Sequence, residues 1–318
     1  MTSRIQAFSA FGSPCSRLVL GAAQLGMSYG VVNKTGRPDL ATARAMIHAL
    51  AESGVTVIDT AAAYGASEEM IGRILWDDAS LQRGTVVVTK LDPLSDADSW
   101  SDAELEQAAV QSIDRSLKAL RMENLPLVLF HVPAQLSVRD GLLLATMGRQ
   151  IDAGKVGALG VSVYAPAEAE AAIAMDEIAA VQLPASVFDH RFLVDGLMDR
   201  AAARGVTLFA RSSYLQGVIV TPPETLPDRL AGLREPVATF HTYCAAWHRS
   251  PADVALAFVR SFAQVQGIVV GMETVAQAQA NVALFLAPPL DKGQRDELLH
   301  LFGALPAHLI NPSMWPPA

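Results

Sequence analysis

Asp59, Lys90 and His131 each follow directly on a short run of apolar, mostly β-branched residues. If the three runs are neighbouring parallel strands, their carboxyl ends place these side chains at one edge of a sheet. Because an unpaired buried charge is costly, we expect Asp59 and Lys90 to form an ion pair. A carboxylate, an amine and an imidazole at one edge suit acid–base chemistry, or Schiff-base chemistry at the lysine.

Tyr64 follows Asp59 by five residues and precedes a helix that we expect to begin near Ser67. Each of the four residues, taken alone, has an ordinary structural interpretation. A strand-end Asp is often a cap or an ion-pair partner, and a lone His is often a hydrogen-bonded structural group. Their combination at matching ends of consecutive runs favours a functional site.

Eight apolar runs, separated by segments with helix signals, would position these residues. Continuous runs are typical of strands that are buried on both faces. The runs are 18–20, 55–58, 85–89, 127–130, 156–161, 178–181, 206–209 and 267–270. Alternating strands and helices indicate parallel strands with right-handed crossovers, so eight units predict an α/β fold, a single-domain (β/α)8 TIM barrel. A Rossmann-like open sheet is the alternative, but no G-x-G-x-x-G motif follows the first run.

Helix boundaries are also visible in the sequence. Ser101 and Glu104 have the spacing of a capping box, and Ser250 before Pro251 is typical of a helix start. We expect left-handed helix exits at Gly54, Gly84, Gly154 and Gly205, each just before a strand. Residues 1–318 are read as one domain, with residues 1–15 as an N-terminal extension or barrel-bottom cap. Residues 222–227 and 306–318 are expected to be loops.

Composition excludes several classes of protein. Of 318 residues, 51% are hydrophobic and 18% charged, which excludes a disordered chain, and a net charge of −8 disfavours nucleic-acid binding. Two cysteines, Cys15 and Cys244, do not form a disulfide framework, and His241 and His248 lack metal-ligand spacing. Without a signal peptide or a long apolar span, we expect a cytoplasmic monomer or small homo-oligomer with no membrane partner and no bound metal.

The segment Asp59-Thr-Ala-Ala-Ala-Tyr64-Gly-Ala-Ser-Glu-Glu-Met-Ile-Gly72, with Lys90 and His131 after the next two runs, resembles the aldo-keto reductase superfamily, including its bacterial members. The similarity extends from about residue 16 to the end of the chain. It includes the segments 20–26, 157–162, 181–182, 210–217 and 271–281. The resemblance implies a barrel enzyme that uses NAD(P)H to reduce an aldehyde or ketone to an alcohol, or that runs the reverse reaction.

The four residues suit that chemistry. Hydride delivered to a carbonyl leaves an alkoxide that needs a proton, and Tyr64 would be the donor. A phenol is a weak acid with a pKa near 10, and the ammonium of Lys90 would lower that pKa. Asp59 would keep Lys90 charged and oriented. His131 would hydrogen-bond the carbonyl oxygen and orient the substrate, or assist proton relay.

The resemblance also assigns residues to an NADP(H) or NAD(H) cofactor. Ser162 and Gln182 match the pair that binds the carboxamide, although Val163 stands where the family commonly has Asn. Arg211 replaces an aromatic residue that stacks on the nicotinamide, and it could stack there or contact phosphate or substrate. The pyrophosphate would lie along Ser212, Leu215 and Gly217, and the adenosine end near Gly271, Glu273, Gln277 and Asn281.

The segment between Gly271 and Asn281 contains no Lys or Arg to bind a 2′-phosphate. Glu273 would repel that phosphate but could accept a hydrogen bond from a free ribose hydroxyl. This pattern favours tolerance of NADH while leaving NADPH open. Alternatively, Glu273 points to solvent and has no influence on the choice of cofactor.

Substrate contacts are expected from Tyr29, near Asn33 on the first strand-to-helix loop, and from Trp315 as a lid over the barrel mouth. The polarity of Tyr29 and Asn33 suits a small carbonyl substrate that is sugar-like or otherwise hydroxylated. Trp76, Trp100 and Trp247 are expected to pack in the core. Two other functions remain open: a lyase or aldolase that forms a Schiff base at Lys90, and a regulatory scaffold that binds nicotinamide without turnover.

Overall fold

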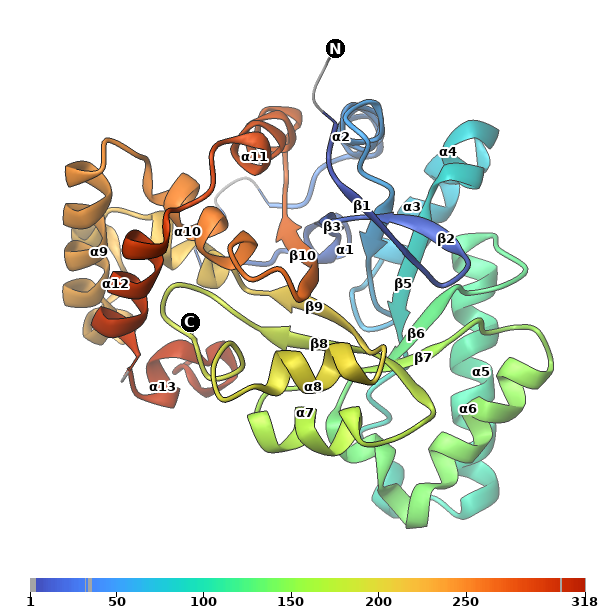
Figure 1. Cartoon of the computed structure of the whole chain (residues 1–318). Coiled ribbons are helices and arrows are strands. Elements are labelled where there is room, and N and C mark those ends of the chain that lie inside the picture. The colour runs from blue at the N-terminus through green and yellow to red at the C-terminus, as the bar shows by residue number, and fades with distance from the viewer. Residues whose placement is uncertain (1–3, 32, 34–35, 304, 318) are drawn as a thin grey trace.

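Eight parallel strands close into a barrel, with helices outside it (Figure 1). The computed structural model describes residues 4–31, 33, 36–303 and 305–317. Strand order around the barrel is β10-β3-β4-β5-β6-β7-β8-β9, and β10 closes it by pairing with both β3 and β9. The expected (β/α)8 fold is confirmed.

The strands are β1 (Ala7–Ala10), β2 (Ser13–Ser16), β3 (Leu18–Gly21), β4 (Val57–Asp59), β5 (Val86–Lys90), β6 (Leu127–Phe130), β7 (Leu159–Ser162), β8 (Ile178–Pro184), β9 (Thr207–Arg211) and β10 (Val265–Gly271). The helices are α1 (Ala23–Gly26), α2 (Leu40–Glu52), α3 (Ser67–Trp76), α4 (Ala79–Gly84), α5 (Asp102–Leu120), α6 (Leu142–Asp152), α7 (Pro166–Ile173), α8 (Leu197–Ala203), α9 (Arg234–Ala246), α10 (Pro251–Arg260), α11 (Val275–Leu286), α12 (Lys292–Phe302) and α13 (Ala307–Ile310). Each of the eight expected runs overlaps one barrel strand, although β7 begins at Leu159 rather than at Val156.

Side-chain alternation along the strands separates the barrel interior from the layer beneath the helices. Val57, Val88 and Leu129 pack in an interior cluster, whereas Ile58, Val87 and Val128 belong to the outer core. Because the strand repeat is two residues, Asp59, Lys90 and His131 follow the interior side chains by one repeat. They therefore point into the carboxyl-terminal mouth of the barrel.

Helix boundaries follow local chemistry. The Ser101 hydroxyl accepts from the backbone N–H of Glu104, whose carboxylate accepts from that of Ser101, so the expected capping box is confirmed. Ser250 likewise accepts from the N–H of Asp253 at the start of α10. Gly54, Gly154 and Gly205 have positive φ, as expected of left-handed exits. Gly84 does not, because it is the last residue of α4 and leads directly into an extended Thr85.

The hairpin of β1 and β2 covers the amino-terminal end of the barrel. Phe8 and Phe11 of this hairpin lie against Phe209, at centroid distances of 6.4 and 6.3 Å, and Cys15 is buried in the interior cluster. The hairpin thus occupies the barrel-bottom position. At the other terminus, residues 306–318 are not a plain loop: α13 and a 3-10 turn at Pro312–Met314 lie within them. A second 3-10 turn, Pro223–Thr225, lies within residues 222–227.

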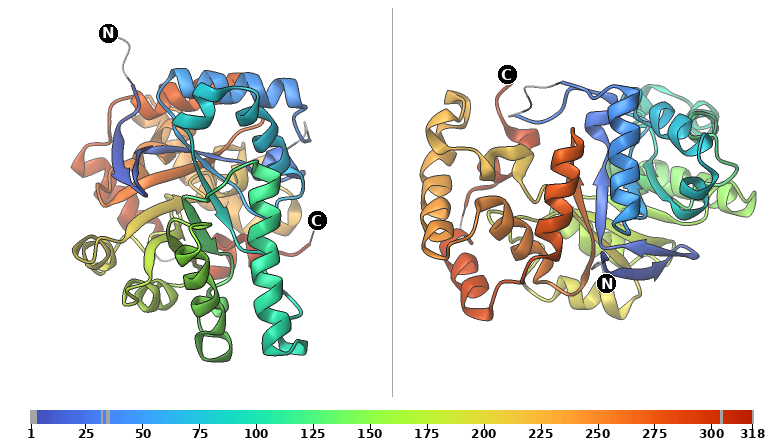
Figure 2. Two further views of the ribbon diagram at one scale, coloured as in Figure 1. Left: turned by 90° about the vertical axis from the view of Figure 1, so that its right-hand side faces the viewer. Right: turned by 90° about the horizontal axis from the view of Figure 1, so that it is seen from above.

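Helices α2 and α11, far apart in sequence, lie side by side outside β3 and β10 (Figure 2). Trp100 and Trp247 pack against the outer core as expected, but Trp76 does not. Its side chain is 60% exposed at the end of α3, with the Arg121 guanidinium 5.9 Å from its ring. Among the described helices, none is long and apolar enough to cross a membrane.

Candidate active site

Asp59 and Lys90 form a buried ion pair at the carboxyl ends of the adjacent strands β4 and β5. The Lys90 ammonium donates to both carboxylate oxygens of Asp59, at 2.8 and 2.9 Å, and to the carbonyl oxygen of Thr60 at 2.8 Å. Burial, the largest single effect, lowers the pKa of Lys90, but the charge and hydrogen bonds of Asp59 together with the interactions of Tyr64 outweigh it, and the pKa is raised. The amine is therefore held as an ammonium, and the expected pairing is confirmed.

Gln182 from β8 is hydrogen-bonded to the same carboxylate. Its amide Nε2 donates to Asp59 Oδ1 at 2.7 Å. A carboxylate accepts hydrogen bonds only, so the amide nitrogen faces Asp59 and the amide oxygen keeps its capacity to accept from a ligand. Ser162 lies beside Gln182 in the register of β7 and β8. The sequence analysis assigned Gln182 to the cofactor but gave no signal of its hydrogen bond to Asp59.

Tyr64 lies above the Lys90 ammonium, which is 4.8 Å from the centroid of its ring. The His131 ring meets that of Tyr64 edge to face, with centroids 5.9 Å apart. A tight turn holds the tyrosine, since the Ser67 N–H donates to the Tyr64 carbonyl. A Cβ on Gly26 would lie 1.6 Å from that carbonyl oxygen, so the close approach of α1 to this turn requires glycine. The structure brings all four expected residues together.

His131 is neutral at physiological pH. Burial, with the nearby positive charges of Lys90 and Arg211, lowers its pKa from 6.5 to about 4. Its Nδ1 atom is buried and has no hydrogen-bond partner in the described part of the chain. A neutral imidazole can donate one hydrogen bond and accept another, which suits contact with a carbonyl oxygen.

Acid is therefore expected to destabilise the protein through His131. Between pH 6.5 and 4 the unfolded chain binds a proton at this histidine and the native state does not, so stability falls as the pH falls through this window. Between pH 7.5 and 5 the loss attributable to His131 is about 2 kcal/mol. Urea denaturation at both pH values should show a smaller pH dependence for His131→Gln. An equal dependence in the two proteins would contradict the proposed burial of the neutral form.

Glu68 is a buried group of this region that the sequence did not single out. Its carboxylate accepts from the hydroxyl of Thr89, next to Lys90, at 2.5 Å and from that of Ser116 in α5 at 3.1 Å. Burial raises the pKa of this carboxyl. Glu68 thus fastens α3 to the end of β5 and to α5. The sequence indicated only a helix start there, because Thr89 and Ser116 are distant in the chain.

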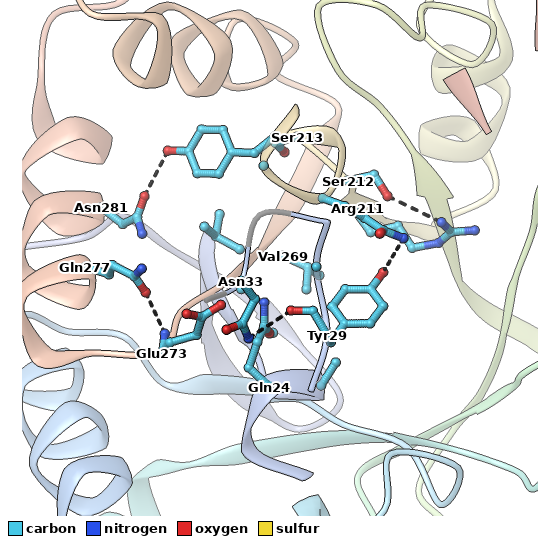
Figure 3. A pocket seen from close by; sticks show the side chains of 18 of the residues that line it. Gln24, Tyr29, Asn33, Arg211, Ser212, Ser213, Val269, Glu273, Gln277 and Asn281 are labelled. Carbon is cyan, nitrogen blue, oxygen red and sulfur yellow. Dashed lines mark hydrogen bonds between the residues drawn. The ribbon is translucent and has the colours of Figure 1, made fainter. Parts of the chain in front are cut away.

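A cavity of about 380 Å³ opens at the mouth, and Asp59 and Tyr64 line it. Figure 3 shows this cavity from close by. Most of the residues assigned to cofactor and substrate line it: Tyr29, Gln182, Arg211, Ser212, Gly217, Gly271, Glu273, Gln277 and Asn281. Ser162 and Leu215 do not; both are buried, and Leu215 packs in the outer core. Arg211 and Tyr29 lie at one end of the cavity, and Gln277 and Asn281 at the other.

The far end of the cavity is held by two side-chain contacts. The backbone N–H of Glu273 donates to Gln277 Oε1 at 2.6 Å. The Tyr214 hydroxyl donates to Asn281 Oδ1 at 2.8 Å, which connects the loop after β9 to α11. The amide nitrogen of Asn281 thereby keeps its capacity to donate.

Several cavity residues were not assigned from the sequence. The polar ones among them include Gln24, Ser213, Tyr214 and Gln216. Three of them follow Arg211 in a loop where Ser212, Leu215, Gln216 and Gly217 all have positive φ. Backbone strain of this kind clusters at ligand-binding loops. The sequence analysis included segment 210–217 in the family resemblance but gave no role to these three side chains.

Trp315 does not reach the cavity. Its indole N–H donates to the Leu309 carbonyl at 3.0 Å, and its ring packs against the outer core. In this structure Trp315 therefore does not form the expected lid over the mouth. Burying the apolar ring of Trp315 against α13 and the outer core is more favourable than exposing it to water at the rim of the barrel. Within the described residues no group of three His, Cys, Asp or Glu side chains is arranged to hold a metal ion.

Comparison with known proteins connects this arrangement to a family. Residues 17–300 match the model of the aldo/keto reductase family. "Uncharacterized oxidoreductase Rv2298" of Mycobacterium tuberculosis is 29% identical over 292 residues, covering 84% of each chain. "Aldo-keto reductase YhdN" of Bacillus subtilis is 27% identical over 207 residues, covering 62% of this chain and 60% of the relative.

A solved structure shows the same fold. The crystal structure of PA4992, a putative aldo-keto reductase from Pseudomonas aeruginosa, aligns with a TM-score of 0.66 at 20% identity, covering 90% of this chain and 97% of the other. The family match extends over the strands that carry Asp59, Lys90 and His131 and over the loops that line the cavity. With its closed barrel and a buried Asp–Lys pair beneath a tyrosine, this chain belongs to the aldo/keto reductase family.

Proposed function

We propose that this protein is an NAD(P)H-dependent oxidoreductase that reduces an aldehyde or ketone to an alcohol, or runs the reverse reaction, with Tyr64 as the proton donor. One observation carries the proposal. A lysine held as an ammonium by Asp59 lies 4.8 Å from the ring of a tyrosine that lines the cavity. An ammonium beside this ring stabilises the negative charge that is left on the oxygen when the tyrosine gives up its proton.

The cavity residues fit a nicotinamide dinucleotide. The Gln182 amide oxygen is available to accept from a carboxamide, because its nitrogen is engaged by Asp59. Ser213 Oγ is buried, lines the cavity and has no partner among the described residues, as expected of a group that awaits a ligand. The amide of Asn281 lies at the opposite end. When bound, the reduced nicotinamide would supply the hydride.

The remaining chemistry belongs to the side chains. Tyr64 protonates the oxygen of the reacting carbonyl, Lys90 stabilises the phenolate that is left, and Asp59 holds Lys90 in place. Neutral His131 donates a hydrogen bond to the same oxygen. A preorganised donor of this kind is worth about 3–4 kcal/mol of barrier, by analogy with oxyanion-hole donors.

The geometry disfavours a Schiff base at Lys90. That chemistry needs a neutral, accessible amine, whereas Lys90 is 1% exposed, has three hydrogen-bond acceptors and has a raised pKa. A regulatory scaffold would bind nicotinamide without turnover. The complete set of Asp59, Tyr64, Lys90 and His131 favours catalysis.

A two-step experiment tests the proposal. NADH and NADPH are first titrated into the protein while tryptophan fluorescence is followed. Aldehydes and ketones, including hydroxylated ones, are then assayed with the preferred cofactor at 340 nm. Saturable binding and carbonyl-dependent oxidation of the cofactor are expected. Binding without turnover on any carbonyl would favour the scaffold, and no binding would refute a nicotinamide enzyme.

The cofactor preference is expected to be weak. We predict that NADH binds no more than about tenfold more weakly than NADPH, because Glu273 lines the cavity and the segment 271–281 offers no cation to a 2′-phosphate. Glu273→Arg should shift the preference toward NADPH, most strongly at low salt. Dissociation constants for both cofactors test this.

Two matched variants control the cofactor experiment. Glu273→Gln removes the negative charge without adding a cation, so it should shift the preference less than Glu273→Arg. Gln279→Arg adds the same positive charge on α11 at an exposed residue that does not line the cavity, and it should change little. A hundredfold preference of the unmodified protein for NADPH would contradict the prediction.

A further inference from the structure

Arg211 ends β9 on the wall of the cavity, and its guanidinium is held in one orientation. Nη2 donates to the Val163 carbonyl at 3.0 Å, and Nη1 donates to Ser212 Oγ at 3.5 Å. The guanidinium carbon lies 4.5 Å from the centroid of the Tyr164 ring. These contacts come from neutral groups. In the part of the chain that the structure describes, no carboxylate forms an ion pair with Arg211.

The charges around the reacting position are therefore unbalanced. Lys90 is matched by Asp59, which also binds Gln182. His131 is neutral, and the charge of Arg211 contributes to lowering its pKa, after burial and Lys90. The charge of Arg211 also acts on Tyr29, across the same end of the cavity. The positive charge of Arg211 is thus unmatched by an ion pair in the cavity that Tyr64 also lines.

A hydride donor that serves Tyr64 must lie close to Arg211. The donor has to approach a carbonyl carbon whose oxygen contacts Tyr64, in the part of the cavity that Tyr64, Gln182 and Arg211 line together. Loss of a hydride turns the neutral dihydronicotinamide ring into a cation. The oxidised ring, and not the reduced one, is then repelled by the guanidinium.

We infer that Arg211 makes this site discriminate between the redox states of its cofactor, so that the reduced form binds more tightly than the oxidised form. The inference rests on the proposed nicotinamide-dependent function. The repulsion between two positive charges a few ångströms apart, at an effective dielectric constant near 20, corresponds to at least about a tenfold tighter binding of the reduced form than of the oxidised form. Carbonyl reduction would gain from this preference, because the spent cofactor is released more readily.

The test measures dissociation constants rather than turnover. NADH, NAD⁺, NADPH and NADP⁺ are titrated by isothermal calorimetry into the unmodified protein, Arg211→Gln and Arg211→Lys. In the unmodified protein we expect the dissociation constant of the oxidised cofactor to be at least about tenfold larger than that of the reduced cofactor. Arg211→Gln should lower this ratio several-fold, and Arg211→Lys, which keeps the charge, should preserve most of it.

ADP-ribose, which lacks the nicotinamide, is the matched control ligand. Its affinity should be the same in the unmodified protein and in Arg211→Gln, because the inferred effect acts on the ring. A loss of ADP-ribose affinity equal to the loss for both redox forms would place Arg211 on a phosphate and overturn the inference.

The remaining outcomes are distinguishable. A ratio near one in the unmodified protein overturns the inference even if no variant can be purified. An unchanged ratio of the two dissociation constants in Arg211→Gln also overturns the inference. Both results leave the proposed function intact. If neither redox form binds the unmodified protein, the proposed function fails together with the inference.

Discussion

Tyr64→Phe is expected to reduce carbonyl substrates at least about 10²-fold more slowly than the unmodified protein, the scale of a positioned general acid. Phenylalanine keeps the ring that contacts His131 and Lys90 but removes the hydroxyl that donates the proton. The fold and the affinity for cofactor should be unchanged, because Asp59 and the Thr60 carbonyl still hold Lys90. Steady-state kinetics with the best carbonyl of the panel, together with circular dichroism, measures both effects.

Tyr243→Phe is the matched control for this change. Tyr243 lies on α9 next to Trp247, at a centroid distance of 5.8 Å, and does not line the cavity. Removing its hydroxyl should leave kcat within about twofold, as for surface substitutions that touch no special feature. Undiminished turnover in Tyr64→Phe would show that another group protonates the alkoxide.

The strand ends explain why so much of the site could be predicted from the sequence. A barrel strand is buried on both faces, so its residues are mostly apolar, and the first charged residue or histidine after the run marks the mouth. Asp59, Lys90 and His131 all stand at that place. The expected ion pair followed because a buried amine and a buried carboxylate on adjacent strands cannot both remain unpaired.

Contacts between distant segments could not be predicted in the same way. Glu68 binds hydroxyls of Thr89 and Ser116, and Gln182 binds Asp59 across 123 positions of the sequence. Such pairs depend on the register and tilt of the closed barrel. Ser213 lines the cavity in the loop after β9, where Ser212, Leu215 and Gln216 have positive φ although they are not glycine. The sequence does not encode those angles in a recognisable pattern.

Trp315 shows where an expectation from the sequence departs from the structure. A tryptophan near the chain end suggests a mobile lid when the preceding segment is taken as a loop. The structure forms α13 there instead, and its Leu309 carbonyl accepts the indole N–H. A short helix of four residues is below the length at which hydrophobic periodicity can be recognised.

Lys90→Met is expected to impair both catalysis and stability. Tyr64 loses the positive charge that stabilises the phenolate left after proton transfer, so kcat should fall at least about 10²-fold. The buried carboxylate of Asp59 would lose its counter-ion and keep the hydrogen bond from Gln182. Breaking a buried ion pair by removing one partner costs about 3–5 kcal/mol. Urea denaturation and steady-state kinetics measure the two losses separately.

The double variant Asp59→Asn/Lys90→Met separates the two roles of the pair. Because it removes both buried charges, it should be more stable to urea than Lys90→Met alone, and the carbonyl oxygen of the new amide can still accept from Gln182. Its turnover should remain as low as that of Lys90→Met, since the charge beneath Tyr64 is still missing. Recovery of activity together with stability would mean that Lys90 acts only through the fold. Recovery of stability alone would show that the Lys90 ammonium assists proton transfer from Tyr64.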